Sequence, residues 1–159
     1  MKTSIKKGVG FGLTSGIITT LGMIVGLNSS THSKVVVIGG ILIIAIADAL
    51  SDSLGVHVSE EAENQHSNKE IWESTLATFF SKFIFALSFI LPFVLFSLQV
   101  AIWVSIVWGL LMIVLFSIYV GRQEKNVKTW SVVLEHLVIA VLVIIVTNYI
   151  GVWVNNIFY

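Results

Sequence analysis

Five long apolar runs, separated by short polar segments, make up most of the 159-residue chain. A helix that crosses the hydrocarbon core of a bilayer needs about 20 mostly apolar residues, and each run is long enough. The runs are continuous, whereas the strands of a membrane barrel would alternate apolar and polar residues. The pattern therefore predicts an all-α membrane protein, with one five-helix transmembrane domain over residues 1–159. With their polar ends included, the helices are expected at about residues 8–27, 35–63, 68–97, 100–120 and 131–157.

Composition narrows the possible functions. The chain is 56% hydrophobic and 11% charged, whereas soluble domains are about 25% charged. It contains no cysteine and its formal net charge is zero, so we expect no disulfide framework, no thiolate metal site and no nucleic-acid partner. The sequence indicates no prosthetic group and no nucleophile–base pair, so a conventional enzyme is not expected.

Lysine and arginine residues predict the orientation in the membrane. Cytoplasmic loops are enriched in these residues, and eight of the nine fall on one side of the predicted helices, with Lys34 alone on the other. The eight are Lys2, Lys6, Lys7, Lys69, Lys82, Arg122, Lys125 and Lys128. The N-terminus is therefore predicted to be cytoplasmic and the C-terminus external. Lys82 is counted as a flank of a cytoplasmic loop, because we expect its ammonium to snorkel to that surface.

Local signals predict how the second and third helices begin and end. Ser67 and Glu70 have the spacing of a capping box, so a helix should begin just after Ser67. The two helices would then form a tight cytoplasmic hairpin that bends near residues 64–67. Pro92, in the middle of the third segment, predicts a kink because proline removes one backbone hydrogen bond.

Small residues line one face of the first predicted helix. Gly8, Gly12 and Gly16 recur every four residues, and Gly22 follows further along. Such faces let membrane helices approach closely. We interpret the four glycines as a face for helix packing or dimerisation, with a glycine-lined path for a substrate as the alternative.

Two aspartates interrupt the second apolar run. As a helix, residues 35–47 span only about 20 Å, whereas the hydrocarbon layer is about 30 Å thick. Asp48 and Asp52 are therefore predicted to lie inside the membrane, in its cytoplasmic half. An ionised aspartate there costs about 2.5–3.5 kcal/mol, and two on one helix face, about 6 Å apart, also repel each other. The pair must be protonated, hydrogen-bonded, hydrated in a cavity or bound to a cation.

Further acidic residues lead from the aspartate pair to the cytoplasmic end. Glu63 lies within about 60° of Asp48 on a helical wheel. The other candidates around the hairpin are Glu60, Glu70, Glu73 and His66. One interpretation is a solvated acidic loop. The other is a mouth that gathers cations above the pair, because carboxylates suit divalent cations and clustered negative charge raises their local concentration.

Two stretches of the chain resemble a known family. Residues 10–26, GFGLTSGIITTLGMIVG, are similar to the first helix of the vacuolar iron transporter (VIT) family, and residues 47–63, ADALSDSLGVHVSEEAE, to its second helix. The resemblance implies a five-helix homodimer that moves ferrous iron, and often manganese, out of the cytoplasm in exchange for protons. It also implies a metal path at the dimer interface, lined by these two helices. The family's helix-one aspartate corresponds to Ser15 here and its helix-two methionine to Asp52, and the cytoplasmic metal-binding insert of plant members is missing.

Together, the residues and the resemblance predict a multi-pass transporter of Fe²⁺ or Mn²⁺ in the cell membrane of a prokaryote. Its expected transport residues are Asp48, Asp52, Ser15 and Glu63, and its expected partners are the metal ion, protons, lipid and a second copy of the chain. The alternative is a non-transporting scaffold or regulatory protein that kept the fold, because the helix-one aspartate and the insert are lost. An intramembrane aspartyl protease is excluded, since its two aspartates must face each other from different helices.

Overall fold

The computed structural model describes residues 3–122 and 128–158, and it is almost entirely helical. The helices are α1 (Thr3–Thr31), α2 (Lys34–Glu63), α3 (Asn68–Ser88), α4 (Ile90–Leu95), α5 (Leu98–Gly121) and α6 (Thr129–Phe158). Five spans are long and apolar enough to cross a membrane, with α3 and α4 counted together as one span, Asn68–Leu95. The prediction of an all-helical protein with five helices able to span a membrane is therefore confirmed. Lys2 and Lys125, which entered the orientation argument, lie outside the described residues.

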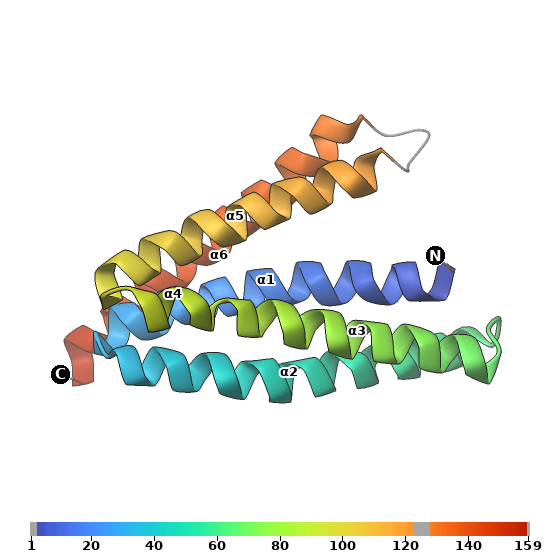
Figure 1. The fold of residues 1–159 in the computed structure, drawn as a ribbon, viewed down its shortest axis with the longest axis horizontal. Helices are drawn as coiled ribbons and strands as arrows, with labels where there is room; N and C mark the ends of the chain where they lie inside the picture. The colour runs from blue at the N-terminus through green and yellow to red at the C-terminus, as the bar shows by residue number, and fades with distance from the viewer. Residues whose placement is uncertain (1–2, 123–127, 159) are drawn as a thin grey trace.

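Helix α1 is the centre of the arrangement. It contacts α2, α3, α5 and α6, and Figure 1 shows α1, α2 and α3 running side by side. Helices α5 and α6 form a second layer that crosses this group near α4 and slants away from it toward the other end (Figure 1). The start of α1, the α2–α3 turn and the end of α5 lie toward one end of the molecule, and the C-terminus lies at the other (Figure 1). This arrangement brings the predicted hairpin to the N-terminal end of α1.

The core is apolar and is built around α1. Its fully or almost fully buried side chains come from α1, α2, α4 and α5 and from the residue between α3 and α4, and they include Ile17, Leu21, Ile24, Val37, Ile41, Phe89, Phe93 and Ile113. The outward faces are also apolar, as at Trp153, which is 61% exposed on α6. A soluble protein rarely leaves so much contiguous apolar surface uncovered, so these faces fit a lipid environment.

Three of the predicted small residues let α1 approach α3. A side chain at Gly8 or Gly12 would overlap the backbone carbonyl of Ser74 or Thr78, respectively. At Gly16 an added Cβ would lie 3.1 Å from Cγ of Lys82. These three glycines therefore serve helix packing within one chain.

The fourth of these glycines faces a different helix. An added Cβ at Gly22 would lie 2.7 Å from Val143 on α6. Helix α1 therefore uses one end of its glycine series against α3 and the other end against α6, and all four glycines contact helices of their own chain.

The third span is interrupted before Pro92. Helix α3 ends at Ser88, and Phe89 joins it to α4. Pro92 has no N–H to donate to the carbonyl of the residue four positions earlier, Ser88, and its ring crowds that carbonyl. The predicted kink thus corresponds to a break one turn before the proline.

Capping residues set the hairpin between α2 and α3. Asn64 ends α2 in the left-handed conformation, with φ at 50°, which asparagine tolerates better than most residues. The Ser67 hydroxyl accepts a hydrogen bond from the Glu70 N–H, and the Glu70 carboxylate accepts one from the Ser67 N–H. The predicted capping box and the bend at residues 64–67 are confirmed.

Candidate functional site

The two aspartates of α2 lie against α1. The Ser15 hydroxyl donates a hydrogen bond to Oδ2 of Asp52 at 2.7 Å, and the Thr19 hydroxyl donates one to Oδ2 of Asp48 at 2.9 Å. Donors and acceptors are each four residues apart on their helices, so the two pairs match turn by turn. The Asp48 and Asp52 side chains remain 28% and 23% exposed, so other helices of the chain do not fully cover them.

Lys82 of α3 contacts both aspartates. Its Nζ lies 2.5 Å from Oδ2 of Asp48, forms an ion pair with Oδ2 of Asp52, and donates a hydrogen bond to the Ser15 hydroxyl at 2.9 Å. The Lys82 side chain is only 1% exposed. The expectation that it snorkels to the cytoplasmic surface is therefore wrong.

Lys82 stays buried because it is far from the end of the helix and because two carboxylates lie within its reach. Lys82 lies about 20 Å along α3 from Asn68, at 1.5 Å per residue, so its side chain cannot reach the helix end. Gly16 has no side chain, which lets the lysine stem lie directly against α1. An intramembrane cation pairs with an intramembrane anion when one is within reach, and here two are.

The structure thus identifies what compensates the aspartate pair. Of the alternatives that the sequence left open, hydrogen bonds from Ser15 and Thr19 and a protein cation, Lys82, are present. Two carboxylates against one ammonium leave one excess negative charge if all three groups are ionised. In that charge state the cluster would still attract a cation.

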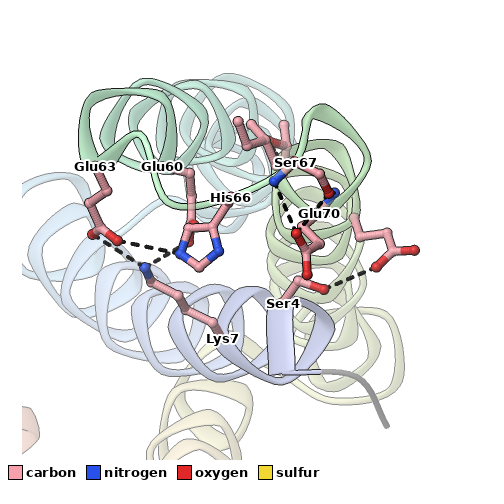
Figure 2. Close-up of polar contacts among 10 residues, drawn as sticks. Ser4, Lys7, Glu60, Glu63, His66, Ser67 and Glu70 are labelled. Atoms are coloured by element: carbon pink, nitrogen blue, oxygen red, sulfur yellow. Dashed lines mark hydrogen bonds and ion pairs between the residues drawn. The ribbon is translucent and has the colours of Figure 1, made fainter.

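A second cluster lies at the hairpin end of α1 and α2 (Figure 2). Nε2 of His66 lies 3.2 Å from Oε2 of Glu60 and 3.5 Å from Oε2 of Glu63. Lys7 of α1 approaches the same carboxylates, with its Nζ 2.7 Å from Oε1 of Glu60 and 3.6 Å from Oε1 of Glu63. One ligand atom each from Glu60, Glu63 and His66 lies within 4.8 Å of the others, so these three residues could share a divalent cation.

The remaining hairpin candidates have other partners. The Glu70 carboxylate accepts hydrogen bonds from Ser67 in the capping box, and Glu73 accepts one from the Ser4 hydroxyl at 3.0 Å. Within the described residues, the group whose ligand atoms could meet at one ion comprises Glu60, Glu63 and His66. The structure therefore does not bring Glu70 and Glu73 into that group.

A groove joins the two clusters along the α1–α2 face. It has a volume of about 500 Å³, with Lys7 and Glu60 among its lining residues toward the hairpin and Asp52 deeper along α2. Its other lining residues are Phe11, Ser51, Gly55, Val56 and Ser59. The groove therefore runs from the hairpin cluster to Asp52, one of the two aspartates.

Sequence reasoning missed that Lys82 and Lys7 belong to these clusters. The available signal for Lys82 was its depth, because a lysine more than three turns from either end of the predicted helix 68–97 needs an intramembrane partner. For Lys7 the sequence held no signal, since pairing it with Glu60 requires knowing that α1 and α2 pack in antiparallel register.

Comparison with known proteins supports the resemblance found in the sequence. Residues 6–71 match a family model described as the VIT family. This segment holds most of α1, all of α2, the hairpin and the first turn of α3, so it includes both aspartates but not Lys82. No curated protein matches the chain. The family suggests metal-ion transport across a membrane, and over this segment the chain is consistent with a VIT family member.

Proposed function

We propose that the protein is a secondary transporter that moves a divalent metal ion, Fe²⁺ or Mn²⁺, out of the cytoplasm in exchange for protons. The observation that carries the proposal is the pair Asp48 and Asp52, partly exposed on a helix long and apolar enough to span a membrane. Carboxylate oxygens are ligands that suit both metals. An intramembrane carboxylate pair is costly to maintain and is a marker of an ion pathway.

The hairpin cluster is the proposed cytoplasmic mouth. Glu60 and Glu63, with His66 beside them, supply negative charge and ligand atoms where the groove opens. Clustered carboxylates raise the local concentration of cations. From there the ion would follow the groove to Asp52 and Asp48. The proposal places the α2–α3 turn and the N-terminus on the cytoplasmic side, as the lysine and arginine distribution predicts.

At the aspartate pair, the ligands are two carboxylates and the Ser15 hydroxyl. Ser15 stands where the family has an aspartate, so one charge has moved from α1 to α2. A divalent ion needs more ligands than these, and a second copy of the chain facing the α1–α2 groove would supply an equal set. We therefore propose a homodimer whose protomers each contribute Asp48 and Asp52. The ligands from the two protomers would all be oxygen atoms, which also bind other hard divalent ions.

Proton exchange follows from charge compensation at one shared set of ligands. Carboxylates that release a divalent cation inside a membrane need other positive charge, because bare intramembrane charge is unfavourable. Protons from the external side would supply that charge and be displaced by the next metal ion. Binding of either ligand would then exclude the other.

Transport by proteoliposomes tests the proposal. Asp52→Asn keeps the shape of the side chain and removes one carboxylate, so Mn²⁺ uptake should fall to the level of empty liposomes. The matched control is Glu135→Gln, which removes the same charge from an exposed position on α6 and should leave uptake unchanged. Wild-type uptake by Asp52→Asn would show that the aspartate pair is not the transport site.

One observation favours a second candidate, a non-transporting scaffold. Because Lys82 already neutralises part of the aspartate charge, the cluster could be a structural ion pair that joins α2 to α3. Calorimetric titration of the purified protein with MnCl₂ separates the two candidates. A transporter should show saturable heat that Asp52→Asn loses, whereas a scaffold should show none.

A further inference from the structure

Lys82 is a buried cation for which metal transport as proposed above assigns no role. We propose that Lys82 is a tethered cation that occupies the Asp48–Asp52 site between transport events and makes the site selective for divalent over monovalent ions. The inference rests on the proposed function, because it names how the same site chooses its ion.

The contacts of Lys82 are those of a bound ion. Its ammonium lies against Oδ2 of Asp48, Oδ2 of Asp52 and Oγ of Ser15. These are the oxygens that a metal ion would use in the same place. A metal ion and the ammonium therefore compete for one set of ligands.

The competition depends on charge. Sodium and potassium carry the same charge as the ammonium, so they gain no Coulomb energy by replacing it. The ammonium is also attached to the site, which gives it a high effective concentration that a free monovalent ion must exceed. A divalent ion carries twice the charge and interacts about twice as strongly with each carboxylate at equal distance. The site should therefore admit divalent ions and reject monovalent ones.

The same competition assists release. A pair of carboxylates that held a divalent ion too tightly would not let it leave, and conduction requires binding weak enough for exit. The Lys82 stem is held against Gly16, so its ammonium stays beside the ligands and can retake them when the ion departs. Removing Lys82 should therefore strengthen ion binding.

Titration of the full-length protein in detergent tests this inference. Binding of MnCl₂ is measured in NaCl and in choline chloride, each at about 0.15 M, so that ionic strength is equal. Wild type should give the same affinity in both salts. Lys82→Gln should bind Mn²⁺ about tenfold more tightly in choline chloride, because the tethered competitor is gone, and NaCl should weaken that binding. The control Lys69→Gln removes an exposed lysine near the start of the same helix and should behave as wild type.

Two results would overturn the inference. Lys82→Gln could match wild type in both salts, or it could lose Mn²⁺ binding while keeping its helical circular dichroism. The second result would show that Lys82 supports the site instead of competing for it.

A thermal-stability measurement separates this inference from the proposed function. If wild type binds no Mn²⁺, the transport proposal fails, but Lys82→Gln should still melt at a higher temperature in NaCl than in choline chloride. An absence of that salt difference would refute the tethered-cation role. If Lys82→Gln does not fold, the double variant Asp48→Asn/Lys82→Gln keeps the site's formal charge. A smaller difference between the two salts is expected of the double variant, and equal melting temperatures would refute the tethered-cation role there as well.

Discussion

Gly12→Ala tests whether the close approach of α1 and α3 is what holds Lys82 at the aspartate pair. An added methyl would overlap the Thr78 carbonyl oxygen and the Ser81 hydroxyl, far inside the 3.0 Å below which real Cβ atoms are essentially never found. The Ser81 hydroxyl is itself held by the Ala77 carbonyl at 2.6 Å. The carbonyl cannot rotate away, so the two helices must separate.

The expected magnitude is the difference between two opposing terms. Overpacking a closely packed interior costs about 1–3 kcal/mol, whereas replacing a helical glycine by alanine gains up to about 1 kcal/mol. Gly12→Ala should therefore lower the free energy of unfolding by about 1–2 kcal/mol. Gly39→Ala is the matched control, because an added Cβ there meets nothing within 4 Å. It should be neutral or stabilising by up to about 1 kcal/mol.

Reversible unfolding in mixed detergent and SDS, followed by circular dichroism, measures both variants. Mn²⁺ binding by Gly12→Ala should strengthen, because moving α3 away from α1 draws the competing Lys82 ammonium away from Asp48 and Asp52. Equal stability of Gly12→Ala and Gly39→Ala would refute the reasoning, because it would mean that α1 and α3 do not meet at this residue.

Two further substitutions test the hairpin. Ser67→Ala removes the capping box and should lower the free energy of unfolding by about 1 kcal/mol. The control Ser97→Ala, at an N-cap without a side-chain hydrogen bond, should change that free energy little. Equal losses in the two variants would contradict the capping role of Ser67. His66→Asn should raise the Mn²⁺ concentration for half-maximal uptake by about tenfold without lowering the maximal rate. The control His32→Asn, in the turn between α1 and α2, should leave that concentration unchanged. A loss of maximal rate in His66→Asn would instead place His66 in the transport step.

The fold was predictable from the sequence because its signals are local. The length of each hydrophobic run predicts a membrane span directly. The spacing of Ser67 and Glu70, which lie within one helical turn, predicts where α3 begins. The predicted helix ends were less accurate, since α1 runs from Thr3 to Thr31 instead of from residue 8 to residue 27. Polar residues such as Lys6 and Asn28 extend a helix beyond its apolar run, and hydropathy does not register them as helical.

The site was only partly predictable because its contacts join distant helices. The two aspartates could be chosen from polarity at membrane depth and Ser15 from the resemblance to the VIT family, and the structure brings the three together. The position of Lys82 depends on which face of α3 meets α1. That face is decided by Gly12 and Gly16, which the sequence offered equally to packing within one chain and to a dimer. A pattern of small residues on one helix indicates that another helix packs closely against it, but it does not indicate which helix that is.

In both clusters the acidic and basic side chains come from different helices. All four carboxylates, at positions 48, 52, 60 and 63, belong to α2, whereas the lysines that meet them come from α3 and α1. A lysine on α2 itself would move with its carboxylates and could be separated from them only by changing its rotamer. Because Lys82 and Lys7 lie on other helices, a shift of α2 along or away from its neighbours loosens both sets of ion pairs together. An ion that replaces the lysines takes all of its carboxylate ligands from α2, so we expect its binding to favour that shift and its departure to restore the contacts between helices.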